Sequence, residues 1–440
     1  MLIPLSNFLA IALRFIDLLV SEVKAARSEL LKVILEPEDR ARFYRELLLK
    51  RWHPLPKAAA PECTVYAVDS SDCLIELAGG GVIHVVRAAA ISNRRGEVRK
   101  LGLHAFYPPP DKELVEYRKL VREHAEHVAA LEAVRDLERG DALLVDGSLF
   151  GRMLHVFRPL RIPGREDFMV DYVETFSKLA SECLRKCVLL VGVAKDSRSS
   201  LLRVALLSEL AMERARELGQ DALAAVASLL KRLRRRPRDA AKLLPSWAQG
   251  ELRDILLEVL DRTPDYKVII ASGVGSGFSP PLRLELKRVS SGFMEAVLDP
   301  RRRRELAEKI AARLPSNVSE REVREALGNI ASYPPVAALY VKLAEGDLPL
   351  RVDIVHPDVL KWSSEPAGFA VGEWHGLTTA TLALLCELYA GPRNYNVLLT
   401  RVDRYVKMTR QSREQYKSTI ESVLNTLIQQ SRGVRRVSFP

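Results

Sequence analysis

Three aspartates in this chain follow short apolar segments that are rich in β-branched side chains. Segments of this composition are typical of buried β-strands. A carboxylate at the end of a buried strand is held rigidly while its oxygens still reach a cleft, which is what a metal ligand requires. The acids are Asp69, which ends residues 64–69, Asp146, which ends residues 142–146, and Asp196, which lies just beyond residues 188–193. Their repetition predicts one site that the fold assembles.

Carboxylates in a basic protein point to hard divalent cations, because Mn²⁺ and Mg²⁺ prefer oxygen ligands. Two such ions roughly 3.5–4 Å apart can activate water and stabilise the leaving oxygen in phosphodiester cleavage. Taken singly, Asp69 and Asp146 also suit turn positions, and Asp196 suits the cap of a helix that starts near Ser199. The repeated pattern favours the metal site, and we expect Mn²⁺ or Mg²⁺ as the cofactor.

The elements around these acids follow a recognisable order. An antiparallel meander of strands comes first, then a long helix, a strand, a second helix and a further strand, which a right-handed crossover makes parallel. This is the order of the ribonuclease H-like fold: an α/β protein with a mixed sheet flanked by helices. The predicted strands cover residues 64–69, 73–77, 82–91, 99–107, 142–146 and 188–193, and the helices cover residues 111–139 and 171–186.

In that fold a fourth acid lies on the first helix. Glu123, Glu126 and Glu132 are the candidates on residues 111–139, because positions three apart share a helix face. We favour Glu132, which lies in the turn nearest Asp146, and keep Glu126 as the alternative.

The remaining segments suggest four parts of the chain. Residues 1–60 form a helical arm with a Pro-rich linker, which suits dimerisation or docking. Residues 61–200 form the first part of the core, residues 201–265 a basic helical insertion, and residues 266–440 the remainder with C-terminal helices. The basic run 231–238 is equally well explained as a solvated helix face or as a DNA contact.

Within the last part, residues 268–272 and 282–288 are predicted strands, and residues 336–343 and 350–355 a hairpin. A capping box at Ser319 predicts a helix start. His356 ends the hairpin and suits either a ligand or a structural role.

Composition favours a polyanionic partner. The chain has 440 residues, a net charge of +11 and a pI near 9.4, which suit nucleic acid binding. Five cysteines without a second pair suit buried thiols in a reducing cytoplasm. Arg14 and Asp17 interrupt the apolar run 8–20, so we expect neither a membrane span nor a secretion signal, and a cytoplasmic location.

Four ordered blocks resemble the NurA nucleases. They are Ala67-Val68-Asp69-Ser70-Ser71, residues 143–149, residues 191–197 and residues 391–403, and the resemblance covers roughly residues 60–410. It implies a ribonuclease H-like core and manganese-dependent DNA cleavage, with 5′ to 3′ exonuclease and single-strand endonuclease activity. It also implies a ring-shaped homodimer that works with a HerA-type hexameric ATPase in archaeal end resection, on single-stranded DNA and duplex ends.

The resemblance also assigns residues. It makes Asp69, a helix glutamate (Glu132 or Glu126) and Asp146 metal ligands, and Tyr395 the family's active-site tyrosine. Where relatives commonly carry His, eight positions beyond that tyrosine, this chain has Asp403. A carboxylate binds a metal but cannot supply a neutral imidazole, so Asp403 bears on metal preference and activity level.

Two other functions fit parts of the sequence. A catalytically weak DNA-binding scaffold that docks or regulates a translocase is favoured by Asp403. An actin-like ATPase or kinase has a similar strand order but expects glycines in the first strand turn, and residues 69–72 contain none. The metal-dependent DNA nuclease is the leading interpretation.

Overall fold

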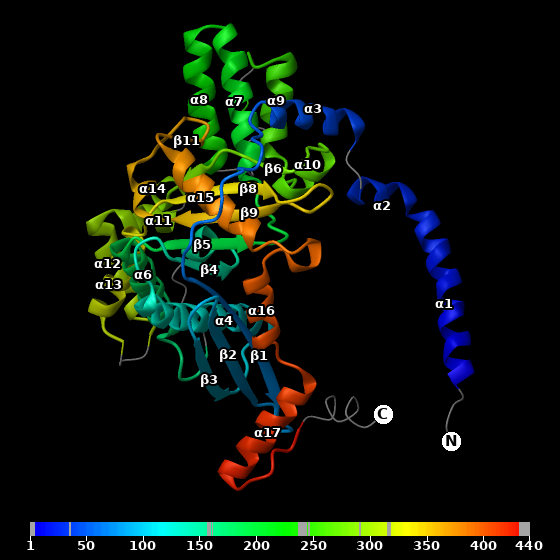
Figure 1. Ribbon diagram of the computed structural model, residues 1–440, viewed down its shortest axis with the longest axis vertical. Coiled ribbons are helices and arrows are strands. Elements are labelled where there is room, and N and C mark those ends of the chain that lie inside the picture. The colour runs from blue at the N-terminus through cyan, green and yellow to red at the C-terminus, as the bar shows by residue number, and fades with distance from the viewer. Residues whose placement is uncertain are drawn as a thin grey trace.

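The computed structural model describes residues 5–34, 37–155, 160, 162–235, 244, 247–289, 292–314 and 318–430. Helices cover both faces of one large mixed sheet, and a helical insertion extends from one end of it (Figure 1).

Nine strands of the described chain form the sheet, in the order β3-β2-β1-β4-β5-β9-β8-β6, with β7 also paired to β8. The first three strands are antiparallel, β4 and β5 run parallel to β1, and β9 is antiparallel to β5. This arrangement confirms the predicted ribonuclease H-like mixed sheet. The strands are β1 Val65–Glu76, β2 Val82–Ser92, β3 Glu97–Phe106, β4 Ala142–Asp146, β5 Leu189–Ala194, β6 Gly277–Phe278, β7 Leu282–Leu284, β8 Val336–Lys342 and β9 Leu350–Val355; a separate pair comprises β10 Ser363–Ser364 and β11 Ala370–Val371.

Each face of the sheet has its own apolar core. On one face the core includes side chains of α4 Asp111–Ala133, α6 Phe168–Lys186, α11 Gly292–Leu298, α12 Pro300–Ala311 and α13 Glu320–Ala331. On the other face it includes side chains of α14 Pro357–Lys361, α15 Trp374–Glu387 and α16 Val397–Val406. Because strand side chains alternate between faces, β1 contributes Tyr66 and Val68 to the first core and Val65 and Ala67 to the second.

The insertion has a third core. It unites α3 Glu38–Leu49, α7 Leu201–Glu217, α8 Gln220–Arg235, α9 Gly250–Leu260 and α10 Asp265–Ala271. The predicted helical character of the insertion is confirmed, while the side chains of the basic run 231–238 lie outside the described residues.

The terminal helices lie apart from these cores. The helices α1 Leu5–Ala25 and α2 Arg27–Ile34 extend away from the sheet, and α17 Arg410–Leu424 lies beside the β1–β3 meander (Figure 1). In the described part of the chain, none of the helices has the length and apolar character that crossing a membrane demands.

The predicted break after Asp69 is wrong. The two predicted segments form one strand, β1 Val65–Glu76, and Asp69 lies within it. The polar stretch stays extended because β2 pairs with it continuously, from Tyr66 opposite Ser92 to Glu76 opposite Val82. Ladder hydrogen bonds therefore outweigh the local turn preference of Asp-Ser sequences.

Three other element predictions need correction. The predicted strand 268–272 is instead the end of the helix α10 and its C-cap, Ser272. The prediction failed because a short apolar run does not distinguish a strand from a buried helix. The predicted strand 282–288 is a short β7 followed by a 3₁₀ turn at Leu286–Arg288. The helix α4 ends at Ala133 and continues as a 3₁₀ turn, Val134–Asp136, rather than reaching residue 139. The Ser319 capping box and the β8–β9 hairpin are confirmed.

Candidate metal centre

The pairing of β1 with β4 brings Asp69 and Asp146 together. The parallel register ends with Val68 opposite Val145, so the two aspartates are the next residues on their strands. Beyond this point β1 continues along β2 while β4 ends in a turn. Two carboxylates are therefore fixed side by side where the strands separate.

Glu126 on α4 is the third acid of this cluster. Burial, followed by the charges of Glu126 and Asp146, raises the pKa of Asp69 to about 8. Ser70, the neighbour of Asp69, donates a hydrogen bond from Oγ to Glu126 Oε1 at 2.5 Å. The structure thus places the alternative candidate, Glu126, against β1.

The favoured candidate, Glu132, lies elsewhere. It forms an ion pair with Lys100 on β3 and its side chain is 42% exposed. Glu132 lies at the C-terminal end of α4, almost two turns beyond Glu126. The structure does not bring Glu132 to the cluster. Glu123 is held separately by His155, at 3.0 Å, and by the Tyr172 hydroxyl, at 2.7 Å.

A buried arginine supports Glu126. Arg152 on the short helix α5 Leu149–Met153 forms an ion pair with Glu126 and donates to the backbone oxygen of Asp146 at 2.9 Å. Its other terminal nitrogen lies 3.0 Å from His127 Nε2. Burial raises the pKa of Glu126, and the charge of Arg152 opposes that rise. Arg152 therefore ties the α4 acid to the end of β4.

Lys195 and Tyr395 cover Asp146 from the other side. The Lys195 ammonium lies 2.9 Å from Asp146 Oδ2 and 4.7 Å from the centre of the Tyr395 ring. The Tyr395 hydroxyl lies 3.5 Å from the same carboxylate oxygen. Burial and the nearby Asp146 charge raise the pKa of this phenol. Tyr395 thus lies beside Asp146 and Lys195.

Asp403 and Asp196 occupy different positions around the cluster. Asp403 lies on α16, which packs over β1, and its charge contributes to the raised pKa of Asp69. Asp196 follows Lys195 with its side chain exposed and its backbone left-handed, at φ 50°. Among the described contacts, none joins Asp196 to the other acids.

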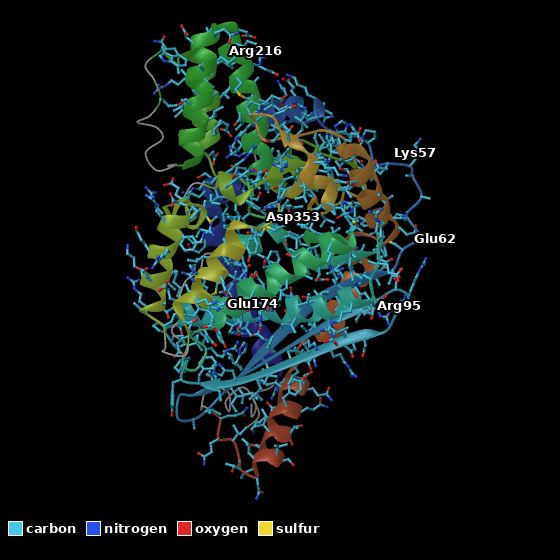
Figure 2. The ribbon with its side chains drawn as sticks, turned by 90° about the vertical axis from the view of Figure 1, so that its left-hand side faces the viewer. Lys57, Glu62, Arg95, Glu174, Arg216 and Asp353 are labelled. Atoms are coloured by element: carbon cyan, nitrogen blue, oxygen red, sulfur yellow. The ribbon has the colours of Figure 1, made fainter. Side chains whose placement is uncertain are left out.

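The turn after Asp146 is held by residues that sequence reasoning missed. Ser148 donates to Asp353 Oδ2 at 2.6 Å, and the Phe150 amide donates to the same oxygen at 3.0 Å. Asp353 is fully buried on β9 beside Arg351, and Figure 2 shows it in the interior. No local sequence signal links Asp353 to a turn some 200 residues earlier. The sequence gives only a weak indication that Arg152 belongs to the site, because Arg152 closely follows the Asp-Gly-Ser turn.

Gly192 lets this turn approach β5. A Cβ at position 192 would lie 2.5 Å from the Gly147 carbonyl oxygen and 2.8 Å from Leu149 Cγ. We expect Gly192→Ala to destabilise the fold by about 1–3 kcal/mol, the cost of overpacking a core, and to shift the turn that carries Asp146. Urea unfolding measures the first effect.

Gly376→Ala is the matched control, because a Cβ there meets no atom within 4 Å. It should leave stability unchanged or raise it slightly, as Ala favours a helix. Equal unfolding midpoints for the two variants would contradict the close approach at Gly192.

His356 does not join the site. It caps α14 by accepting from the Asp358 amide at 3.2 Å. Its neighbour Val355 pairs with Leu190, near the start of β5, whereas the acids lie at the other end of these strands. Of the two roles considered for His356, its contacts support the structural one.

The donor set fits a hard divalent cation. Three carboxylates from three elements converge, and their mutual repulsion is what a cation would relieve. Among the described residues, no three His, Cys, Asp or Glu side chains stand at metal-ligand spacing. Two of the three acids pair with cationic side chains instead, Asp146 with Lys195 and Glu126 with Arg152.

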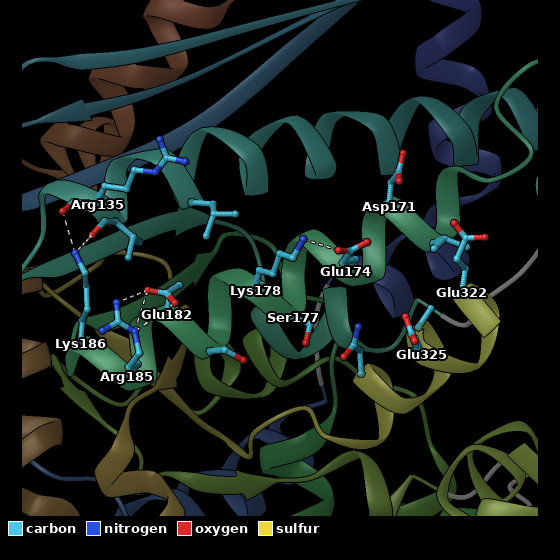
Figure 3. A pocket seen from close by; sticks show the side chains of 16 residues that line it. Arg135, Asp171, Glu174, Ser177, Lys178, Glu182, Arg185, Lys186, Glu322 and Glu325 are labelled. Atoms are coloured by element: carbon cyan, nitrogen blue, oxygen red, sulfur yellow. Dashed lines mark hydrogen bonds and ion pairs between the residues drawn. The ribbon is translucent and has the colours of Figure 1, made fainter. Parts of the chain in front are cut away.

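Another groove lies away from the acids. It has a volume of about 1030 Å³ and runs between α4, α6 and α13. Figure 3 shows that three of its cationic side chains are paired: Lys178 with Glu174, Arg185 with Glu182, and Lys186 with carbonyl oxygens.

Together the sheet order and the clustered acids define a ribonuclease H-like protein. A family model described as the NurA domain matches residues 63–408. The chain therefore belongs to the NurA family, as the sequence blocks indicated.

One solved structure agrees with this assignment in fold. The chain is similar to the NurA nuclease from Sulfolobus solfataricus, with 12% identity and a TM-score of 0.52, over 92% of this chain and 97% of that chain. A structure of NurA bound to dAMP and manganese matches with 16% identity and a TM-score of 0.39, over 94% of this chain and 96% of that one. No curated protein sequence matches the chain.

Proposed function

We propose that the chain is a divalent-metal-dependent deoxyribonuclease that hydrolyses phosphodiester bonds. The observation that carries this proposal is the convergence of Asp69, Glu126 and Asp146 within a NurA domain. The net charge of +11 supports a nucleic acid substrate.

The chain's own residues have distinct roles in this proposal. Asp69, Glu126 and Asp146 would hold Mn²⁺ or Mg²⁺, which would supply Lewis-acid activation of water and of the leaving oxygen. Arg152 keeps the Glu126 carboxylate oriented. Lys195 releases Asp146 and binds the scissile phosphate, since an ammonium group is a compact donor for phosphate oxygens. Tyr395 orients Lys195 beneath its ring.

The wider assignments rest on the family resemblance. We propose 5′ to 3′ exonuclease action with single-strand endonuclease activity, a homodimer, and a HerA-type hexameric ATPase as partner in DNA end resection in the cytoplasm. Asp403 is proposed as a peripheral acid that substitutes for the family histidine.

Size-exclusion chromatography with the ATPase should yield a stable complex, and separate elution would count against the partnership.

The test uses purified full-length chain with end-labelled single- and double-stranded DNA, in Mn²⁺, Mg²⁺ or chelator. We expect cleavage only with metal. Asp146→Asn should lose about 10³-fold in rate, equivalent to about 4 kcal/mol, while retaining DNA binding.

Asp136→Asn is the control, because Asp136 accepts a hydrogen bond from Tyr66 outside the cluster. Cleavage that persists in chelator or in Asp146→Asn would overturn the proposed chemistry. Binding without cleavage in every metal would instead support the DNA-binding scaffold, which Asp403 favours.

A further inference from the structure

A second groove lies on the same face of the sheet as Asp69. It has a volume of about 480 Å³, within the range of roughly 300–1,000 Å³ that ligand pockets occupy. Its floor includes Arg87 and Ala89 on β2 and Arg99 and Leu101 on β3; its wall includes Tyr405 and Val406 on α16 and Tyr416 on α17.

The strand register places this groove beside the acid cluster. Asp69 is opposite Ala89, and Ala89 is opposite Arg99, so the three side chains form one row on one face. Two strand spacings separate Asp69 from Arg99, about 10 Å. The intervening residue, Ala89, is buried, because α16 packs over both β1 and β2. The wall helix, α16, also carries Asp403.

The lining combines an exposed aromatic ring with an exposed cation. Tyr405 is 42% exposed, and the Arg99 side chain is 74% exposed. Glu97 fixes both: the Tyr405 hydroxyl donates to Glu97 Oε1 at 2.6 Å, and Arg99 Nε lies 3.4 Å from the same oxygen. The aromatic wall is therefore anchored at its hydroxyl.

The wall is also rigid at its base. Arg87 donates to the backbone oxygens of Val406 at 2.8 Å and Lys407 at 2.6 Å, and to the Tyr416 hydroxyl at 3.2 Å. These bonds fix the segment between α16 and α17 against β2. Further exposed cations are Arg94 and Arg95 between β2 and β3, Arg404 on α16, and Lys407 just after α16, and Figure 2 shows Arg95 at the edge of the sheet.

We propose that this groove is a single-stranded DNA subsite adjoining the acid cluster. One base of the strand stacks on Tyr405 and a neighbouring phosphate binds Arg99. Proteins that hold single strands without sequence preference combine aromatic platforms with cationic side chains in this way. The inference rests on the proposed nuclease function, because it supplies the strand that the acids cleave.

Glu97 has a defined part in the subsite. Its carboxylate competes with phosphate for Arg99, so DNA binding must displace the Arg99–Glu97 pair while Glu97 keeps the Tyr405 hydroxyl. Glu97→Gln retains an acceptor for the hydroxyl but removes the competing charge. It should therefore bind DNA a few-fold more tightly.

The experiment measures fluorescence anisotropy of a labelled oligothymidylate about 16 nucleotides long, with full-length protein in chelator. Tyr405→Ala should weaken binding about tenfold, whereas Tyr405→Phe, which keeps the ring, should bind like the unsubstituted protein. Arg99→Ala should weaken binding and reduce the slope of log affinity against log salt by about 0.7, the share of one single-strand phosphate contact.

Matched controls exist on other surfaces. Arg321 has an equally exposed side chain, at 78%, paired with Glu325 on α13. Tyr107, beyond the far end of β3, is 73% exposed. Arg321→Ala and Tyr107→Ala should leave the affinity and salt slope unchanged.

The outcomes separate this inference from the function on which it rests. If the unsubstituted protein binds and cleaves DNA but Tyr405→Ala and Arg99→Ala match their controls, the subsite is overturned and the nuclease stands. If Tyr405→Ala alters the oligomeric state but not the DNA affinity, the groove is a protein interface and the inference fails. If the unsubstituted protein binds no DNA, both proposals fail.

Discussion

Glu126→Gln should reduce DNA cleavage by about 10³-fold, while Glu132→Gln should leave it within about twofold. The amide removes one negative charge from the cluster, and a metal ligand lost from such a site is expected to cost several kcal/mol of transition-state stabilisation. Glu132 is tied to Lys100 at a partly exposed position, where substitutions usually have small effects.

Steady-state rates on end-labelled single-stranded DNA over a range of Mn²⁺ concentrations measure both variants. Glu126→Gln should also need more metal for half-maximal rate, while its DNA affinity in chelator stays unchanged. Equal losses in the two variants, or a larger loss at Glu132, would show that α4 contributes a different acid from the one the contacts indicate.

The choice between these glutamates shows where sequence reasoning ends. Helical spacing indicates that Glu123 and Glu126 share one face of α4, but it does not show how α4 crosses the sheet. The spacing therefore could not exclude Glu132 as the ligand. That crossing places Ser70 against Glu126 and Lys100 against Glu132. Which glutamate lies beside the acid cluster therefore depends on long-range packing, which no local sequence pattern encodes.

The strand order was accessible from the sequence, because consecutive strands joined by short turns or by helices admit few topologies. The proximity of Asp69 and Asp146 follows from that order. Each aspartate comes directly after the last residue of the parallel register between β1 and β4. The continuity of β1 through residues 69–72 did not follow, because the turn preference of those residues is local and their pairing with β2 is not. Asp353 was missed for the same reason, because its bond to Ser148 is not local in sequence.

Arg152→Leu should lower the free energy of unfolding by about 3–5 kcal/mol, the cost of removing one partner from a buried ion pair. Arg152 is 5% exposed, and its loss leaves Glu126 buried without its cation and the Asp146 carbonyl without its donor. Urea unfolding at neutral pH measures the change, and Arg321→Leu, which breaks an exposed pair, should change stability by less than about 1 kcal/mol.

The double variant Arg152→Leu with Glu126→Leu distinguishes a charge effect from a packing effect. If the uncompensated Glu126 carboxylate causes the loss, removing it as well should restore a substantial part of the stability, because apolar replacements of buried ion pairs are often neutral or stabilising. The double variant should nevertheless stay inactive, since the cluster lacks its α4 acid. A double variant no more stable than Arg152→Leu would mean that Arg152 acts mainly through its bonds to His127 and the Asp146 carbonyl. Recovered stability without recovered cleavage would show that the Arg152–Glu126 pair does not stabilise the fold. Its role would then be to hold an acid beside Asp69.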